Sequence, residues 1–175
     1  MLDAAGVEYR AERPDVDESA VKAGLTEPEQ IAGELAALKA RSIGADWAIG
    51  SDSVVSVDAR LFDKPAGREQ AAEHLRFFSG KAMVLTSAVA LARNGTVDWH
   101  CTDRATLQVR LLSDEFIHSY LDAEWPEVGH CVGVFRLEGR GVQLFDRIDG
   151  NYFTILGMPL LPLLGALRER GLAPR

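Results

Sequence analysis

Hydrophobic residues recur at two different spacings along this chain. From Ala105 to Leu111 every second residue is apolar and the residues between them are polar, which is the period of a strand with one buried face. In the segment that follows Thr26, apolar residues stand three and four positions apart, which is the period of an amphipathic helix. Both patterns occur several times, and together they predict a protein of mixed α and β structure.

Helix signals are found in four parts of the sequence. Thr26-Glu27-Pro28-Glu29 has the form of a capping box with a proline just inside the helix start. Ile31, Leu35 and Leu38 continue its apolar face. Further helices are expected over 68–78, after Ser113 and from about Met158. Their expected buried residues are Ala71, Ala72, Leu75 and Phe78, then Phe116, Ile117, Tyr120 and Leu121, and finally Leu160, Leu163, Leu164 and Leu167.

Strand signals occupy much of the remaining sequence. Residues 47–57 are rich in β-branched and aromatic side chains, and the chain is expected to return through Leu61 and Phe62 as a hairpin. The apolar run 82–91 predicts a buried strand, and Asn94-Gly95 predicts a type I′ turn into the next strand. At the start of the chain, Gly6 suits the end of a helix, and a strand is expected over 7–11.

The bulk composition narrows the classes of function. Hydrophobic residues make up 47% and charged residues 26% of the 175 residues, ordinary proportions for a globular protein. The net charge of −7 disfavours a general nucleic-acid binder, which would carry a basic excess. Prolines and a glycine interrupt the longest apolar run, so no membrane span is expected. Two cysteines and a start that lacks the pattern of a signal peptide favour a soluble cytoplasmic protein with reduced thiols.

Asp52 is the first candidate for chemistry. It stands in the middle of an apolar strand, among Gly50, Ser51 and Ser53. An unpaired carboxylate is costly to bury, so Asp52 is expected to face a cleft, a cation or a metal. The same small residues also favour turns, and an Asp that ends a strand and caps a turn remains the alternative.

Two lysines and a second acid stand near the ends of predicted elements. Lys39 lies at the edge of a helix, and Lys64 precedes a proline that holds it in an extended backbone. Glu18 belongs to an acidic segment that is either a solvated loop or a donor of carboxylates to a cation. Acids that bind Mg²⁺ beside lysines that hold phosphate oxygens suit the hydrolysis of phosphate esters.

Other constellations give weaker signals. His100-Cys101 and His130-Cys131 could contribute to a zinc site, but neighbours on a strand point to opposite faces and no Cys-x-x-Cys pair is present. Ordinary core thiols explain these residues better. The sequence also lacks a Gly-x-Ser-x-Gly elbow, a P-loop and a Gly-x-Gly-x-x-Gly motif.

A series of short motifs resembles the Maf family of nucleoside triphosphate pyrophosphatases in order and spacing, over essentially the whole chain. The motifs are Val16-Asp17-Glu18, Lys39-Ala40, Gly50-Ser51-Asp52-Ser53-Val54, Lys64-Pro65, Ser79-Gly80 with Thr86, Glu138-Gly139, and the runs Leu144 to Asn151 and Leu156 to Leu160. The resemblance implies an elongated α/β fold of the Maf/Ham1-like kind, with a mixed sheet and a central cleft. It implies a single domain over residues 1–175.

The resemblance also implies a reaction and a set of residues. The reaction is hydrolysis of a nucleoside triphosphate to a monophosphate and pyrophosphate with a divalent metal cation, Mg²⁺ or Mn²⁺. Asp52 corresponds to the general base, Lys39 and Lys64 to lysines beside the phosphates, and Glu18 with Asp52 to the metal ligands. The alternative is a catalytically weak nucleotide-binding regulator of cell division.

The glycine-rich loop resembles that of the branch acting on 7-methyl-GTP. Glu138 stands where the dTTP and UTP branch carries Gln, and a carboxylate can accept the paired N–H donors of guanine. Ser53 stands where the 7-methyl-GTP branch usually carries Gln. Ser53, Thr86, Arg136 and Glu138 are the expected substrate-binding residues.

Family members begin with a strand that leads into a Ser-x-Ser-x-x-Arg loop for the triphosphate. This sequence starts inside the following helix, so it is expected to be short at its N-terminus relative to the family. Two explanations remain open, a start site upstream of Met1 and a natively short protein of low activity. Expected partners are a nucleoside triphosphate and a second copy of the chain in a homodimer, with neither nucleic acid nor membrane.

Overall fold

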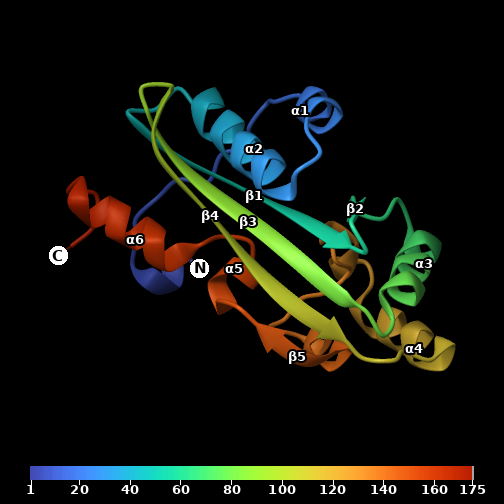
Figure 1. Cartoon of the computed structure of the whole chain (residues 1–175). Coiled ribbons are helices and arrows are strands. Elements are labelled where there is room, and N and C mark those ends of the chain that lie inside the picture. Colours follow the sequence, from blue (N-terminus) through green and yellow to red (C-terminus); the bar gives the residue numbers. More distant parts are fainter. Residues whose placement is uncertain (175) are drawn as a thin grey trace. The chain divides into compact units, whose positions relative to one another are not determined.

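The computed structural model describes residues 1–174. Six α-helices and five strands follow one another within these residues (Figure 1). The helices are α1 (Ser19–Gly24), α2 (Pro28–Ser42), α3 (Arg68–Phe78), α4 (Asp114–Glu124), α5 (Tyr152–Ile155) and α6 (Leu160–Glu169). The strands are β1 (Trp47–Val57), β2 (Arg60–Phe62), β3 (Ala82–Arg93), β4 (Thr96–Val109) and β5 (Phe145–Asp149). Short 3-10 helices are η1 (Asp3–Ala5), η2 (Glu127–His130) and η3 (Arg140–Leu144).

The five strands form one sheet in the order β2-β1-β3-β4-β5. β1 pairs antiparallel with β2, and β4 pairs antiparallel with β5. A two-residue turn at Asn94 and Gly95 joins β3 to β4, with φ of 50° and 78°. Positive φ at both central residues is what a type I′ turn requires, so this prediction is confirmed. The expected α/β fold class is confirmed as well.

The chain divides into two compact units. The first contains residues 1–53, 86–103 and the segment from 151 onward, and the second contains residues 54–85 and 104–150. The expectation of a single domain over the whole chain stays a prediction. None of the described helices is long and apolar enough to cross a membrane.

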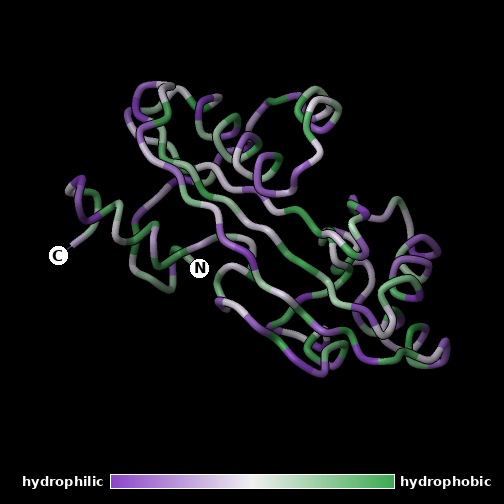
Figure 2. The backbone as a smooth tube through the Cα atoms, viewed as in Figure 1, coloured by the Kyte–Doolittle hydropathy of each residue, from purple (hydrophilic) through white to green (hydrophobic). Residues whose placement is uncertain are grey.

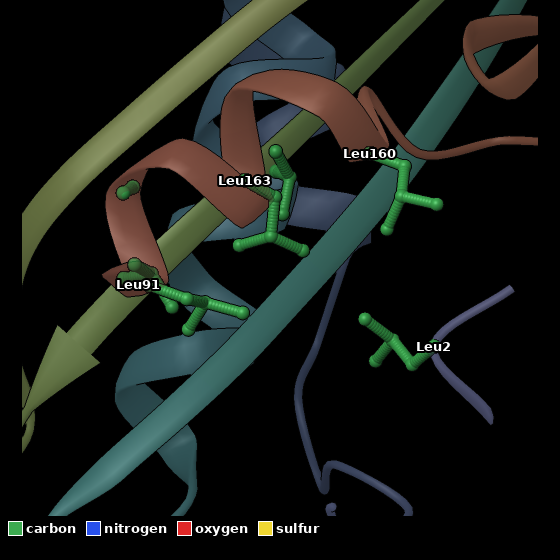
Figure 3. Close-up of a cluster of buried hydrophobic side chains, with 7 residues drawn as sticks. Leu2, Leu91, Leu160 and Leu163 are labelled. Atoms are coloured by element: carbon green, nitrogen blue, oxygen red, sulfur yellow. The ribbon is translucent and has the colours of Figure 1, made fainter. Parts of the chain in front are cut away.

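One hydrophobic cluster of the first unit lies where α6 meets β3. Figure 3 shows Leu160 and Leu163 of α6 beside Leu91 of β3, with Leu2 from the N-terminal segment completing the cluster. Ala166 and Leu167 extend the same buried face of α6. Ala166 takes the place predicted for Leu164, which is only partly buried. In Figure 2 this helix changes from hydrophobic to hydrophilic toward its end, where its charged residues lie.

The core of the second unit contains an aromatic cluster formed by β2 and α3. The Phe62 ring makes an edge contact with Phe78, at 4.7 Å between centroids, and another with His74 at 5.1 Å. Arg76 of α3 donates to Asp114 of α4 at 2.6 Å, which joins the two helices at the surface. The predicted span of α3 and its four buried residues are confirmed.

Two local predictions are wrong. The strand expected over 7–11 is not formed. The capping box at Thr26 is also absent, because α2 begins at Pro28 and Glu27 occupies the N-cap position with extended backbone. Proline at the first helical position pushes the residue before it out of the helical region, and this moves the cap from Thr26 to Glu27. The cap predicted at Ser113 is confirmed, since its Oγ accepts from the Phe116 amide at 3.1 Å.

Candidate functional site

The position of Asp52 depends on the glycine two residues before it. A Cβ built on Gly50 would lie 2.2 Å from the Ala36 carbonyl oxygen and 2.4 Å from the Ala40 nitrogen. Only glycine therefore permits α2 to approach β1 this closely. Alternate residues of a strand share a face, so Asp52 lies on the same face as Gly50, toward the end of α2. Lys39 belongs to that end of α2.

The Lys39 ammonium lies between two carboxylates. It donates to Oδ1 of Asp52 in a short hydrogen bond and lies 2.9 Å from Oε1 of Glu18. The Lys39 side chain is 19% exposed and that of Asp52 is 15% exposed. The sequence prediction that Glu18, Lys39 and Asp52 act together thus agrees with their positions. Their functional roles stay a prediction.

Lys22 joins this cluster, although the sequence prediction omitted it. Its Nζ lies 3.8 Å from Oε2 of Glu18, one helical turn away. Its positive charge also lowers the pKa of Asp52, as a minor effect. The i, i+4 spacing of Glu18 and Lys22 was a usable signal, since acid and base at this spacing meet on a helix.

The pKa values of Asp52 and Lys39 reflect both the burial of the two groups and their pairing. Burial raises the pKa of the Asp52 carboxyl, and the hydrogen bond and charge of Lys39 oppose this rise only in part. Burial lowers the pKa of Lys39, but its hydrogen bonds to Asp52 and Glu18 outweigh burial and raise it above the ordinary value. Lys39 is therefore a fixed cation, and Asp52 is a stronger base than a free Asp, as suits a general base.

The opposite face of β1 holds a hydroxyl network. Ser51 donates to the carbonyl of Gly157 at 2.7 Å, and Ser53 lies 3.3 Å from the same oxygen. Ser53 Oγ is also 2.7 Å from Ser87 Oγ, and Ser87 donates to the Thr154 carbonyl at 2.8 Å. The two residues that flank Asp52 are thus tied to the segment around α5. This network was not predicted, although alternate serines on a strand indicate a polar face.

The remaining predicted residues are divided between the two units. Thr86 belongs to the first unit and is fully buried on β3. Lys64, Arg136 and Glu138 belong to the second unit. There the charges of all three act on the Cys131 thiol, whose pKa is raised chiefly by burial. Glu138 raises it further, while Arg136 and Lys64 oppose the rise. Arg136 and Glu138 lie on the loop between η2 and η3, whereas Lys64 lies between β2 and α3.

Two carboxylates that share one cation can also share a metal ion. Glu18 and Asp52 already converge on the Lys39 ammonium, and Mg²⁺ is commonly held by one or two carboxylates together with water and phosphate oxygens. Within residues 1–174 there is no cluster of three or more His, Cys, Asp or Glu able to hold a metal. The donor set therefore fits a cation that substrate phosphates help to bind, and it does not fit a zinc site of His and Cys.

Comparison with known proteins places this chain in a family. The family model described as Maf-like protein matches residues 1–170. The chain belongs to the Maf family. A relative from Rhizobium etli named 7-methyl-GTP pyrophosphatase is 42% identical, over 98% of this chain and 90% of the relative. A relative from Nitrobacter hamburgensis named nucleoside triphosphate pyrophosphatase is 43% identical, over 98% of this chain and 88% of the relative.

A third Maf relative, from Sphingopyxis alaskensis, is also named nucleoside triphosphate pyrophosphatase. It is 41% identical, over 100% of this chain and 93% of the relative. The predicted membership of the Maf family is confirmed.

Proposed function

We propose that this chain hydrolyses nucleoside triphosphates to the monophosphate and pyrophosphate. The observation that carries the proposal is the convergence of Glu18, Lys39 and Asp52 on one point beside β1. The names of the Maf relatives support the same reaction. In this reaction water attacks the α-phosphorus, the bond from that phosphorus to the bridging oxygen breaks, and pyrophosphate leaves.

Each of the three residues has a role in this reaction. Asp52 takes the proton of the attacking water, and its raised pKa suits a base that works near neutral pH. Lys39 orients the Asp52 carboxylate and places positive charge where the phosphates bind. Glu18 and Asp52 would hold a divalent cation, Mg²⁺ or Mn²⁺. When bound, this cation neutralises charge on the pyrophosphate leaving group.

The preferred substrate is proposed to be 7-methyl-GTP. Glu138 is exposed, and as a carboxylate it can accept hydrogen bonds only. The guanine edge presents two N–H donors, whereas a pyrimidine carbonyl needs a donor from the protein. A carboxylate at this position therefore favours guanine over uracil or thymine. The proposed location is the cytoplasm, which suits the free thiols of Cys101 and Cys131.

The test is release of pyrophosphate from a panel of nucleotides. The panel contains 7-methyl-GTP, GTP, UTP and dTTP, each with Mg²⁺ or Mn²⁺ and with EDTA. We expect release from 7-methyl-GTP that EDTA abolishes, and a loss of about 100-fold or more in Asp52→Asn. Asp58→Asn is the matched control, because Asp58 lies outside the quoted motifs and its side chain is 61% exposed. Tight nucleotide binding without release, with Asp52→Asn unchanged, would overturn the proposal and favour the nucleotide-binding regulator.

A further inference from the structure

The loop that carries Glu138 is buried in its first part and exposed to solvent in its second part. Gly133, Val134 and Phe135 are buried, while Glu138 and Arg140 are exposed. The loop has no strand or α-helix between η2 and η3, so hydrogen bonds of regular secondary structure do not determine its conformation. Short backbone turns and the side chains of neighbouring elements determine it instead.

Val134 is the strained point of this loop. Its φ is +56°, a left-handed conformation that β-branched residues rarely adopt, and its side chain is completely buried. Tyr120 of α4 donates its hydroxyl to the Val134 carbonyl at 3.0 Å, and Tyr120 is itself only 4% exposed. Strained backbone persists where surrounding contacts hold it. The Tyr120 hydroxyl is such a contact.

Glu124 lies one helical turn after Tyr120 and contacts the loop at a second point. Its side chain is 8% exposed, and each carboxylate oxygen faces a different arginine. Oε2 lies 3.5 Å from Nη2 of Arg136, and Oε1 lies 4.0 Å from Nε of Arg140. These two arginines stand two residues before and two residues after Glu138. One buried acid therefore draws together both sides of the turn that presents Glu138.

The backbone of this turn is equally constrained. The Gly139 amide donates to the Arg136 carbonyl at 3.2 Å. A Cβ on Gly141 would lie 2.5 Å from the same carbonyl oxygen, so the chain closes on itself here. Within the described residues, Glu138 forms neither an ion pair nor a hydrogen bond through its carboxylate, although two arginines flank it. Glu124 is the carboxylate that both guanidinium groups face.

We propose that Tyr120 and Glu124 are positioning residues that determine which nucleobase the loop accepts. Tyr120 fixes the buried half of the loop, and Glu124 engages Arg136 and Arg140 so that the Glu138 carboxylate stays available to the base. Without the negative charge of Glu124, the two arginines can pair with Glu138 and compete with the guanine donors. This inference rests on the proposed function, because it assumes that Glu138 reads the base.

The first experiment measures steady-state kinetics of Glu124→Gln and Tyr120→Phe with 7-methyl-GTP, GTP and UTP. For Glu124→Gln we expect KM for the two guanine nucleotides to rise about tenfold, the effect of weakening one charged hydrogen bond. We expect kcat and the KM for UTP to change little. Glu115→Gln, an exposed acid on the same helix, is the control and should match the unmodified protein.

A charge rescue separates positioning from general damage. Arg140→Gln, added to Glu124→Gln, removes one of the two cations that would pair with Glu138, so KM for guanine nucleotides should fall part of the way back toward its original value. A purely structural role of Glu124 would not be rescued by removing one more side chain. Failure of the rescue, with all variants folded, would overturn the proposed charge effect.

Hydrogen exchange tests the positioning role without any activity. Amides of residues 131–141 should exchange faster in Tyr120→Phe and Glu124→Gln than in Glu115→Gln. Unchanged exchange and unchanged KM in these variants would overturn the inference, while a shift of selectivity in Glu138→Gln would still support the proposed function. If Glu138→Gln leaves selectivity unchanged, the proposed base reader fails, whatever the exchange shows.

Discussion

The ammonium of Lys39 on α2 donates to the carboxylate of Asp52 on β1, and both side chains are largely buried. This contact joins a helix and a strand at the point where Gly50 permits them to approach. Because Glu18 lies on the other side of the same ammonium, one lysine fixes two acids at once. The following predictions concern this cluster and the contacts that support it.

Removing the charge of Lys39 should impair catalysis more than stability. In Lys39→Met, Asp52 loses the donor that orients it, and the proposed phosphate site loses a cation. We expect kcat/KM for nucleotide hydrolysis to fall by about 100-fold or more, a typical loss for one preorganised donor. Arg41→Met, on the same helix but in a surface pair with Glu34, is the control. Equal activity in both variants would contradict the role of Lys39.

Any side chain at position 50 should destabilise the first unit. Gly50→Ala places a methyl group against the backbone of α2, which cannot move as a flexible side chain could. We expect a loss of about 3 kcal/mol in the free energy of unfolding, at the upper end for overpacked cores. Urea denaturation measures it. Gly44→Ala is the control, because a Cβ there meets nothing within 4 Å, and it should unfold at nearly the same urea concentration as the unmodified protein.

The hydroxyl of Ser87 should contribute measurably to stability. Ser87 is fully buried and links Ser53 to the Thr154 carbonyl. In Ser87→Ala both partners lose a hydrogen bond inside the protein, and we expect a cost of about 1–3 kcal/mol. Ser119→Ala, on the exposed face of α4, should cost far less. If the two variants unfold at the same denaturant concentration, the hydroxyl network of β1 adds no stability.

Acidification should destabilise the second unit through His74. Burial, together with the charge of Arg60, lowers the pKa of this imidazole below its ordinary value of 6.5. The unfolded chain therefore binds a proton at a pH where the folded protein does not. The contribution of neutral His74 is complete above pH 6.5 and is lost as the pH falls from there through the folded-state pKa. The stability difference between the unmodified protein and His74→Gln, measured by denaturation at several pH values, should shrink on acidification.

Signals between near neighbours allowed much of the fold to be predicted. The span of α3, the Ser113 cap and the Asn94-Gly95 turn each depend on a few adjacent residues. The capping box at Thr26 was predicted wrongly because two local preferences compete there, and the proline at the first helical position prevails.

Much of the candidate site depends on distant residues and could not be predicted in this way. The hydroxyl network of β1 joins Ser53 to Ser87 across 34 positions of sequence, and no local pattern specifies that pairing. Likewise, the buried Glu124 is an ordinary helix residue in the sequence, and only the folded loop shows that it faces two arginines. Glu18, Lys39 and Asp52 were singled out as acids and a lysine near the ends of predicted elements, and the family resemblance gave them roles. Lys22 was found only in the structure.

The contacts of Gly157 have a consequence for the order in which the protein assembles. Ser51 and Ser53 reach its carbonyl across 106 and 104 positions of sequence. During synthesis, β1 leaves the ribosome long before residue 157 is made. The contacts of Ser51 and Ser53 with Gly157 therefore cannot form until almost the whole chain has been synthesised. Contacts this distant in sequence also slow folding, because a long loop must close before they form. β1 therefore gains these contacts among the last parts of its unit, and a chain that ends before residue 157 lacks them.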